Sequence, residues 1–336
     1  MALLGGSKLK KVLITGAAGY IGSVLTRVLL DEGYSVRGLD SLSFGGYSLF
    51  EPYFNPNFEF IRGDIRNSYD VEKAINGVDA VVHLAAVVGD PACAKEPELA
   101  SEINWEASKK LFDSCGKVEN IKNFVFASTC SNYGRMENDG YVNEESPLRP
   151  VSIYATLKVK FEDYLMNSNI RDDLATTSLR FSTVYGLSPR LRFDLTVNEF
   201  IRTASFSEEL VIYGEQFWRP YCHVSDLARS CELVLRSDPK LVKSNVFGVG
   251  DTSENYQKKM LVEEIQKIIP NAKVKYVEKN EDPRNYRVDF TKIKKELGFE
   301  ITKTVPDGLR EINSFLKSEI LSDPYSPQYS NIGVAK

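Results

Sequence analysis

The sequence predicts an α/β protein with a doubly wound parallel sheet, in which helices cover both faces. Short runs of apolar and β-branched residues alternate with helical patterns through the first half of the chain. The first run leads directly into a glycine-rich turn, residues 16–22, and polar residues follow several later runs. In sheets of this kind the ligand lies beyond the carboxyl ends of the strands. We therefore expect the functional site at that edge.

Composition narrows the class of protein. A chain of 336 residues with 43% hydrophobic and 26% charged residues can form one large or two modest domains. Its net charge of −4 gives no attraction to nucleic acid or to anionic membranes, and no stretch is long and apolar enough to span a bilayer. The five cysteines lie far apart and form no Cys-x-x-Cys pair, so we expect neither a disulfide framework nor a metal site. These features favour a cytoplasmic protein.

The strands can be placed in order from the apolar runs, with helices between them. A further helix is expected over 224–236 and a further strand over 246–250, where the chain returns to the sheet. The strands expected in the first half are 12–15, 35–39, 58–61, 80–83, 124–127 and 176–181.

This pattern indicates two interleaved domains. Residues 1–182, with a returning segment at about 223–250, are expected to form a dinucleotide-binding domain. Residues 183–222 and 251–320 are expected to form a smaller C-terminal substrate-binding domain. The polar segment 321–336 is expected to be a loose tail.

Gly16, Gly19 and Gly22 stand between a strand and an amphipathic helix, which is the context that a dinucleotide-binding fingerprint requires. The first glycine permits a tight turn, the second lets the backbone approach a pyrophosphate, and the third lets the helix pack closely. Tyr20 and Ile21, at the start of the helix, are then candidates for contact with the cofactor.

Residues after the next strands refine the cofactor prediction. Asp40 closes the second strand, where a carboxylate bonds both ribose hydroxyls and repels a 2′-phosphate, so NAD is favoured over NADP despite the nearby Arg37. Asp64 and Ile65 could bond and flank the adenine, although Asp64 could equally be a helix N-cap. His83 is expected to be a core histidine. The cofactor-lining candidates after the fourth strand are Leu84, Ala85 and Ala86.

Tyr154 and Lys158 lie four residues apart on an expected helix and so share a face. The ammonium of Lys158 would lower the pKa of the Tyr154 phenol, which makes a usable base near neutral pH. The alternative is an exposed helical pair without function. The glycine-rich turn upstream favours the catalytic interpretation.

Together these residues resemble the extended short-chain dehydrogenase/reductase family, in its NAD-dependent nucleotide-sugar epimerase/dehydratase branch. The resemblance runs from about residue 11 to residue 299 and implies a Rossmann-type fold, NAD as cofactor and a nucleotide-diphosphate sugar as substrate. Its further motifs are Ser128-Thr129-Cys-Ser-Asn-Tyr133-Gly134, Arg180-Phe-Ser-Thr-Val-Tyr185-Gly186, Gly214-Glu-Gln-Phe-Trp-Arg219 with His223 and Asp226, and Asp282-Pro-Arg284 through Asp289.

The resemblance implies roles for several residues. Tyr154 would take a proton from a sugar hydroxyl while hydride leaves the same carbon for the nicotinamide. Thr129, with Ser128 beside it, would hold that hydroxyl, the alternative being polar capping at a strand end. Lys158 would also bond the nicotinamide ribose. Asn104 would steady the active-site backbone, the alternative being an asparagine on a helix surface.

Asn198, Arg219 and Arg284 resemble ligands of the substrate's diphosphate, and guanidinium groups suit phosphate oxygens. The asparagine that is usual in the Arg-Tyr-Phe-Asn motif is Thr183 here, so one contact to the diphosphate is expected to differ.

Dehydratases of this branch carry an Asp-Glu pair directly after the threonine, where this chain has Cys130 and Ser131. Without a carboxylate there, 4,6-dehydration lacks its proton donor. Val88, in the loop 87–93, and the segment 188–194 would face the sugar. These two segments are similar to a sub-branch that acts on unusual sugars, including heptoses, in which some members stop at oxidation.

We expect an NAD-dependent nucleotide-sugar epimerase that acts at C4 through a transient 4-keto intermediate. A net 4-dehydrogenase or 4-keto reductase on the same substrate class is the first alternative. A non-catalytic dinucleotide sensor or RNA-binding relative is the second, and the intact Thr129, Tyr154 and Lys158 argue against it. The resemblance also implies a homodimer formed through two helices per subunit, around 100–115 and 154–166.

Overall fold

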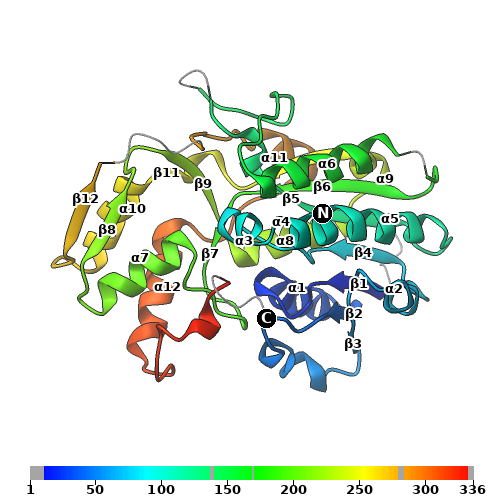
Figure 1. Cartoon of the computed structure of the whole chain (residues 1–336), viewed down its shortest axis with the longest axis horizontal. Coiled ribbons are helices and arrows are strands. Elements are labelled where there is room, and N and C mark those ends of the chain that lie inside the picture. The colour runs from blue at the N-terminus through cyan, green and yellow to red at the C-terminus, as the bar shows by residue number, and fades with distance from the viewer. Residues whose placement is uncertain (1–10, 137–139, 169, 279–283, 332–336) are drawn as a thin grey trace.

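A single parallel sheet organises the computed structural model, which describes residues 11–136, 140–168, 170–278 and 284–331. Its strands are β1 (Lys11–Thr15), β2 (Ser35–Asp40), β3 (Phe58–Arg62), β4 (Ala80–His83), β5 (Asn123–Thr129), β6 (Ala175–Phe181) and β10 (Asn245–Val249). They lie in the order β10-β6-β5-β4-β1-β2-β3 (Figure 1). All neighbours are parallel, which confirms the doubly wound α/β fold.

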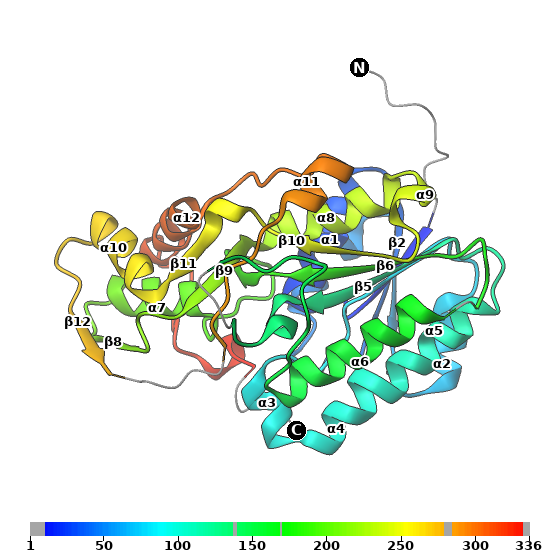
Figure 2. The same cartoon turned by 90° about the horizontal axis from the view of Figure 1, so that it is seen from above.

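Helices cover both faces of this sheet (Figure 2). One face carries α1 (Tyr20–Asp31), α8 (Val224–Arg236), α9 (Pro239–Val242) and α11 (Thr291–Leu297). The other carries α2 (Ser68–Ile75), α3 (Asp90–Lys95), α4 (Pro97–Ser101), a π-helical turn η3 (Glu102–Ala107), α5 (Ser108–Gly116) and α6 (Ile153–Asn167). The three central residues of β1 are apolar, as expected for a strand buried on both faces: Val12 and Ile14 pack on the α1 side and Leu13 on the other.

A smaller domain lies beyond the carboxyl edge of the sheet (Figure 1). A three-stranded sheet consists of β7 (Thr183–Tyr185), β9 (Trp218–His223) and β11 (Asn255–Gln257), and a strand pair consists of β8 (Leu210–Tyr213) and β12 (Val274–Val277). Its helices are α7 (Thr196–Ser205), α10 (Lys258–Ile268) and α12 (Val305–Lys317). Tyr185, Ile201, Leu261 and Leu309 belong to the separate core of this domain.

Two segments differ from the expected domain boundaries. Residues 286–299, assigned from sequence to the substrate domain, return to the first domain, because Val288, Phe290 and Phe299 join its core and α11 packs beside β10. The tail from residue 321 is packed rather than loose as far as residue 331, its last described residue. The backbone N–H of Phe193 donates to the carbonyl of Tyr329 at 2.8 Å.

Within the described ranges, no helix combines the length and the apolar character that crossing a membrane requires.

Candidate active site

The glycine-rich turn forms a cradle at the start of α1. Gly16 has a φ of +77°, and a Cβ added to it would lie 2.9 Å from the backbone nitrogen of Ala85. A Cβ on Gly22 would lie 2.0 Å from the carbonyl oxygen of Gly16. The first turn of α1 has neither a side-chain cap nor an acidic residue. The first N–H groups of a helix have no intrahelical partner, so those of Tyr20 and Ile21 suit an anion such as a pyrophosphate.

Asp40 lies beside this cradle. Its carboxylate accepts hydrogen bonds from the backbone N–H of Ala18 at 2.9 Å and of Leu42 at 2.8 Å, and burial raises its pKa. Arg37, the residue that could have favoured NADP, pairs instead with Glu59 at 2.8 Å and donates to backbone carbonyls before β4. The carboxylate of Asp40 therefore lies at the expected ribose position, whereas the guanidinium of Arg37 is engaged elsewhere.

The candidates after β3 and β4 separate into two groups. The backbone N–H groups of Leu84 and Ala85 bond to Thr15, so these residues, followed by Ala86, lie directly against the glycine turn. By contrast, Ile65 is buried in the core on the α5 side of the sheet, and the carboxylate of Asp64 binds Arg66.

The purely structural roles considered for Asp64 and His83 have different outcomes. Asp64 is not the N-cap of α2, because that position is held by Asn67. His83 is a core histidine as expected: its ring nitrogens lie 2.7 Å from the hydroxyl of Thr15 and 2.9 Å from that of Ser108. Burial lowers the pKa of His83 to about 3, so the ring is neutral.

Thr129 ends β5 and is the N-cap of the short 3₁₀ turn η4 (Cys130–Tyr133). Its hydroxyl oxygen accepts from the backbone N–H of Ser131 at 3.1 Å, and the neighbouring Ser128 accepts from Asn132 at 3.0 Å. Capping uses only a lone pair of Thr129, and its hydroxyl hydrogen remains available to donate. Capping and substrate contact are therefore compatible.

Tyr154 and Lys158 lie on α6, which packs on β5. The ammonium of Lys158 donates to the carbonyl of Ala127 at 2.7 Å and lies 5.9 Å from the centre of the Tyr154 ring. Burial lowers the pKa of Lys158 to about 8.

The phenol of Tyr154 differs from the sequence-based expectation of a lowered pKa. Burial is the largest cause and raises the pKa of Tyr154 above its ordinary value, with further contributions from Cys93 and Asp90. The hydroxyl makes no hydrogen bond to any residue that the structure describes. It is thus a group that substrate can reach but that needs a nearby positive charge to ionise.

Asn104 projects from the π-helical turn η3 and is buried. Its amide donates to the carbonyl of Val87 at 2.9 Å and accepts from the N–H of Val87 at 2.8 Å. Both backbone groups of Val87 are thereby fixed, and Val88 follows in the same half-buried loop. Asn104 therefore holds the loop backbone and is no helix-surface residue.

Asp90 was not singled out in the sequence, yet it links the two sides of the site. One carboxylate oxygen accepts from the N-cap residue of α6, Ser152, at 2.6 Å, and the other pairs with Arg284 at 2.6 Å. The only signal in the sequence was an acidic residue in the loop 87–93, which does not reveal a partner 194 positions away.

The two arginines predicted to bind a diphosphate converge on Tyr286. The guanidinium of Arg219 lies 5.2 Å from the centre of the Tyr286 ring, and both Arg219 and Arg284 act against the burial that raises the pKa of Tyr286. Thr183 begins β7, which pairs with β9, the strand that carries Arg219. Asp282, part of the motif around Arg284, lies outside the described residues.

Asn198 has a different role from the one expected. Its amide group bonds the backbone N–H of Gly186 at 3.0 Å, the carbonyl of Arg192 at 2.8 Å and the hydroxyl of Tyr20 at 3.1 Å. These protein partners engage both of its amide hydrogens and its oxygen. Asn198 therefore holds the loop 186–192 against α1 instead of presenting its amide to a phosphate.

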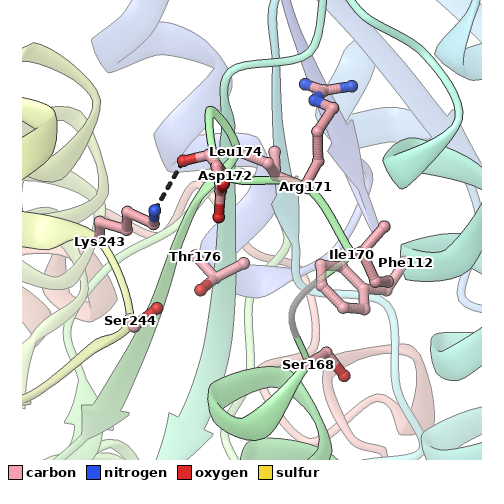
Figure 3. Close-up of a pocket in the computed structure, with 9 residues that line it drawn as sticks. All are labelled: Phe112, Ser168, Ile170, Arg171, Asp172, Leu174, Thr176, Lys243 and Ser244. Carbon is pink, nitrogen blue, oxygen red and sulfur yellow. Dashed lines mark hydrogen bonds between the residues drawn. The ribbon is translucent and has the colours of Figure 1, made fainter.

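A pocket lies at the opposite edge of the sheet (Figure 3). Thr176 at the start of β6 and Ser244 just before β10 line it, and Lys243 donates to the carbonyl of Asp172 at its rim. This edge carries the amino ends of the parallel strands, whereas the ligands of such sheets lie at the carboxyl ends. The pocket is thus separate from the residues described above.

Comparison with known proteins agrees with this geometry. Residues 12–250 match the model of the NAD dependent epimerase/dehydratase family. The chain belongs to this family. It is accordingly an NAD-dependent enzyme, and the glycine cradle and Asp40 fit that cofactor. Membership sets aside the alternative of a non-catalytic sensor.

Members of the epimerase/dehydratase family resemble the chain over most of its length. It is 30% identical over 321 residues to the uncharacterized UDP-glucose epimerase YtcB of Bacillus subtilis, covering 92% of this chain and 98% of that protein. It is 31% identical over 307 residues to dTDP-glucose 4,6-dehydratase of Streptomyces griseus, covering 89% and 91%. The structure of UDP-glucuronic acid 4-epimerase from Bacillus cereus in complex with UDP-glucuronic acid and NAD matches with a TM-score of 0.82 at 27% identity, covering 92% and 99%.

Proposed function

We propose that the protein is a nucleotide-sugar epimerase that acts at C4 through a transient 4-keto intermediate. The observation that carries this proposal is a Tyr154 hydroxyl without a hydrogen bond to the described residues, on a helix that packs on β5, the strand that ends in Thr129. Relatives named as UDP-sugar 4-epimerases support the substrate class. The substrate class is a nucleotide-diphosphate sugar, which includes unusual sugars such as heptoses.

Each of these side chains has a chemical task in that reaction. Bound NAD supplies the hydride acceptor and a positive charge near the phenol. Tyr154 takes the proton from the C4 hydroxyl, and Thr129 donates a hydrogen bond to the same oxygen. Lys158 adds a second positive charge, which favours the phenolate over the phenol. Arg219 and Arg284 hold the diphosphate, and Asp90 orients Arg284.

Dehydration is disfavoured by the residues that follow Thr129. Cys130 is buried and its thiol contacts the carbonyl of Arg180 at 3.2 Å, while Ser131 lies 3.4 Å from the hydroxyl of Tyr286. Burial raises the pKa of the Cys130 thiol well above its ordinary value. Neither side chain supplies the acid that expelling water requires.

The deciding experiment follows the hydride. A panel of nucleotide sugars is screened for thermal stabilisation with NAD present, and the best ligand is then prepared with deuterium at C4. An epimerase returns the same hydride, so the deuterium stays at C4 and NADH does not accumulate. Loss of the label to free NADH, or isolation of a stable 4-keto sugar, would overturn the proposal in favour of a net dehydrogenase or reductase.

We also propose that the protein is a cytoplasmic homodimer. All five cysteines are free and buried, which suits a reducing compartment. The helices expected at the dimer interface, α5 and α6, lie side by side on one face of the sheet (Figure 2). Light scattering on the purified protein measures the mass, and a monomer at micromolar concentration would contradict this arrangement.

A further inference from the structure

Arg190 is a buried guanidinium that the reaction described above does not use. Arg190 is 7% exposed, and among the described residues only its Nη2 has a hydrogen-bond partner, the carbonyl of Ser330 at 3.3 Å. Nε and Nη1 are buried without a hydrogen-bond partner among the described residues. Buried donors are costly to leave unpaired, and a buried unpaired charge is more so. The two unpaired nitrogens of Arg190 can therefore donate to a bound anion.

The segment around Arg190 is fastened to the start of α1. The hydroxyl of Ser188 donates to the carbonyl of Tyr20 at 2.7 Å and lies 3.1 Å from the hydroxyl of Ser23. The backbone N–H of Arg190 in turn donates to Ser188 at 3.3 Å. The backbone of Arg190 is therefore tied, through Ser188, to the first turn of α1.

The other side of Arg190 faces the loop after β2. Its guanidinium carbon lies 4.7 Å from the centre of the Phe44 ring. This loop is tied to the cradle, because Ser48 donates to the carbonyl of Ala18 at 2.8 Å and Leu42 donates to Asp40. Arg190 thus contacts a loop that is itself bonded to Asp40 and to the glycine cradle.

Nearby groups offset the charge of Arg190 only in part, because Asp194 favours the charged form less than burial and Arg192 oppose it. The nearby carboxylate of Asp194 pairs with Arg192, at 2.6 Å. Burial, followed by repulsion from Arg192, lowers the pKa of Arg190 to about 10. A doubly charged anion would relieve both effects.

We propose that Arg190 binds the pyrophosphate of NAD together with the N-terminus of α1. The two unpaired donors match an anion rich in acceptor oxygens, and guanidinium is the side chain best suited to it. A pyrophosphate is also present in the nucleotide-sugar substrate, but Arg219 and Arg284 around Tyr286 form a separate cationic cluster for that group. The position of Arg190 beside α1 and Phe44 favours the cofactor.

The bond to Ser330 extends the proposal to the C-terminal segment. Residues 326–331 contact the same loop, since the N–H of Asn331 also donates to Asp194 at 3.1 Å. This segment therefore forms one wall of the cofactor site beside Arg190.

The test measures binding without turnover, so it is independent of whether the reaction is epimerisation. Calorimetric titration of wild-type protein and Arg190→Gln with NAD, ADP-ribose and UDP separates the two pyrophosphate sources. We expect affinity for NAD and for ADP-ribose to fall at least about tenfold and affinity for UDP to change less than about twofold. The melting temperature of the ligand-free variant should be unchanged or higher, because an uncompensated buried charge is removed.

Arg202→Gln is the matched control. Arg202, on α7, also holds the C-terminal segment: its guanidinium carbon lies 4.3 Å from the centre of the Tyr325 ring. This variant loosens the same segment away from α1, and its affinity for NAD should stay within about twofold of wild type.

Three results would overturn the proposal. Wild-type NAD affinity in Arg190→Gln would show that Arg190 does not touch the cofactor. Equal losses in the Arg190 and Arg202 variants would assign the effect to the C-terminal segment. Weakened UDP binding with intact NAD binding would place Arg190 at the substrate's diphosphate instead.

Discussion

At the scale of single residues, the phenol of Tyr154 decides whether the site is catalytic. Tyr154→Phe removes the proton acceptor and leaves the ring, so we expect turnover to fall at least about a hundredfold. The glycine cradle and Asp40 are untouched, so NAD affinity should be retained. Steady-state rates and NAD titration on the same preparation check both statements, and near-normal turnover would remove Tyr154 from the mechanism.

Asp90 is predicted to tune that phenol as well as to orient Arg284. Its negative charge contributes to raising the pKa of Tyr154. Asp90→Asn removes this charge, so the pKa of Tyr154 should fall and the acid limb of the kcat/KM profile should move to lower pH. A merely structural role would lower activity at every pH without moving the limb, which is the result that would contradict this prediction.

At the scale of elements, a buried ion pair joins α6 to β6. Arg180 pairs with Glu162 at 2.6 Å, with side chains 6% and 2% exposed, and Ser178 donates to the same carboxylate at 2.7 Å. Glu162→Ala leaves Arg180 buried without its counter-charge, and removal of one partner of such a pair costs about 3–5 kcal/mol.

Urea unfolding at pH 7.5 measures this loss, with Arg236→Ala as the control on α8. Arg236 pairs with Glu232 within one helix, and its side chain is 50% exposed, so its removal should cost less than about 1 kcal/mol. Equal losses in the free energy of unfolding for the two variants would mean that burial of the Glu162–Arg180 pair does not add to stability.

At the scale of the whole molecule, local sequence patterns correctly predicted the positions of strands and helices, which depend on nearby residues. The run 80–83 and the helix 224–236 match β4 and α8, because apolar periodicity reflects burial directly. The cradle followed from glycine spacing in the same way. The return of residues 286–299 did not, since no local signal says which of two cores a segment joins.

Contacts between residues far apart in the sequence explain the remaining differences between the expected site and the site in the structure. The contact of Asp90 with Arg284 and that of Asn198 with Tyr20 join residues more than 170 positions apart. The sequence offered Asn198 and Arg284 as site candidates and did not single out Asp90, and none of their partners could be predicted because these depend on how the two domains meet. The raised pKa of Tyr154 has a related origin, because it comes from burial and from Cys93 and Asp90, which lie about 60 positions earlier in the chain.

The stability of the whole fold should depend on pH through His83 at the centre of the sheet. Its ring packs against Phe126 and is held neutral, with a pKa of about 3 caused by burial and then by the charge of Lys158. The unfolded chain has an ordinary histidine pKa of about 6.5. The stabilisation is therefore complete above about pH 6.5 and is lost as pH falls towards 3, because the unfolded state binds a proton that the native state does not.

We expect the free energy of unfolding of wild-type protein to fall by up to about 1.4 kcal/mol per pH unit through this group below pH 6. Urea titrations between pH 7.5 and pH 5.0 cover a window in which most carboxylates are still ionised in both states. His83→Asn keeps hydrogen-bonding groups near Thr15 and Ser108 but cannot titrate. Its stability should be lower at pH 7.5 through lost packing, yet its dependence on pH should be flatter than that of wild type. Parallel curves for the two proteins would show that His83 is not the group whose protonation unfolds the sheet in mild acid.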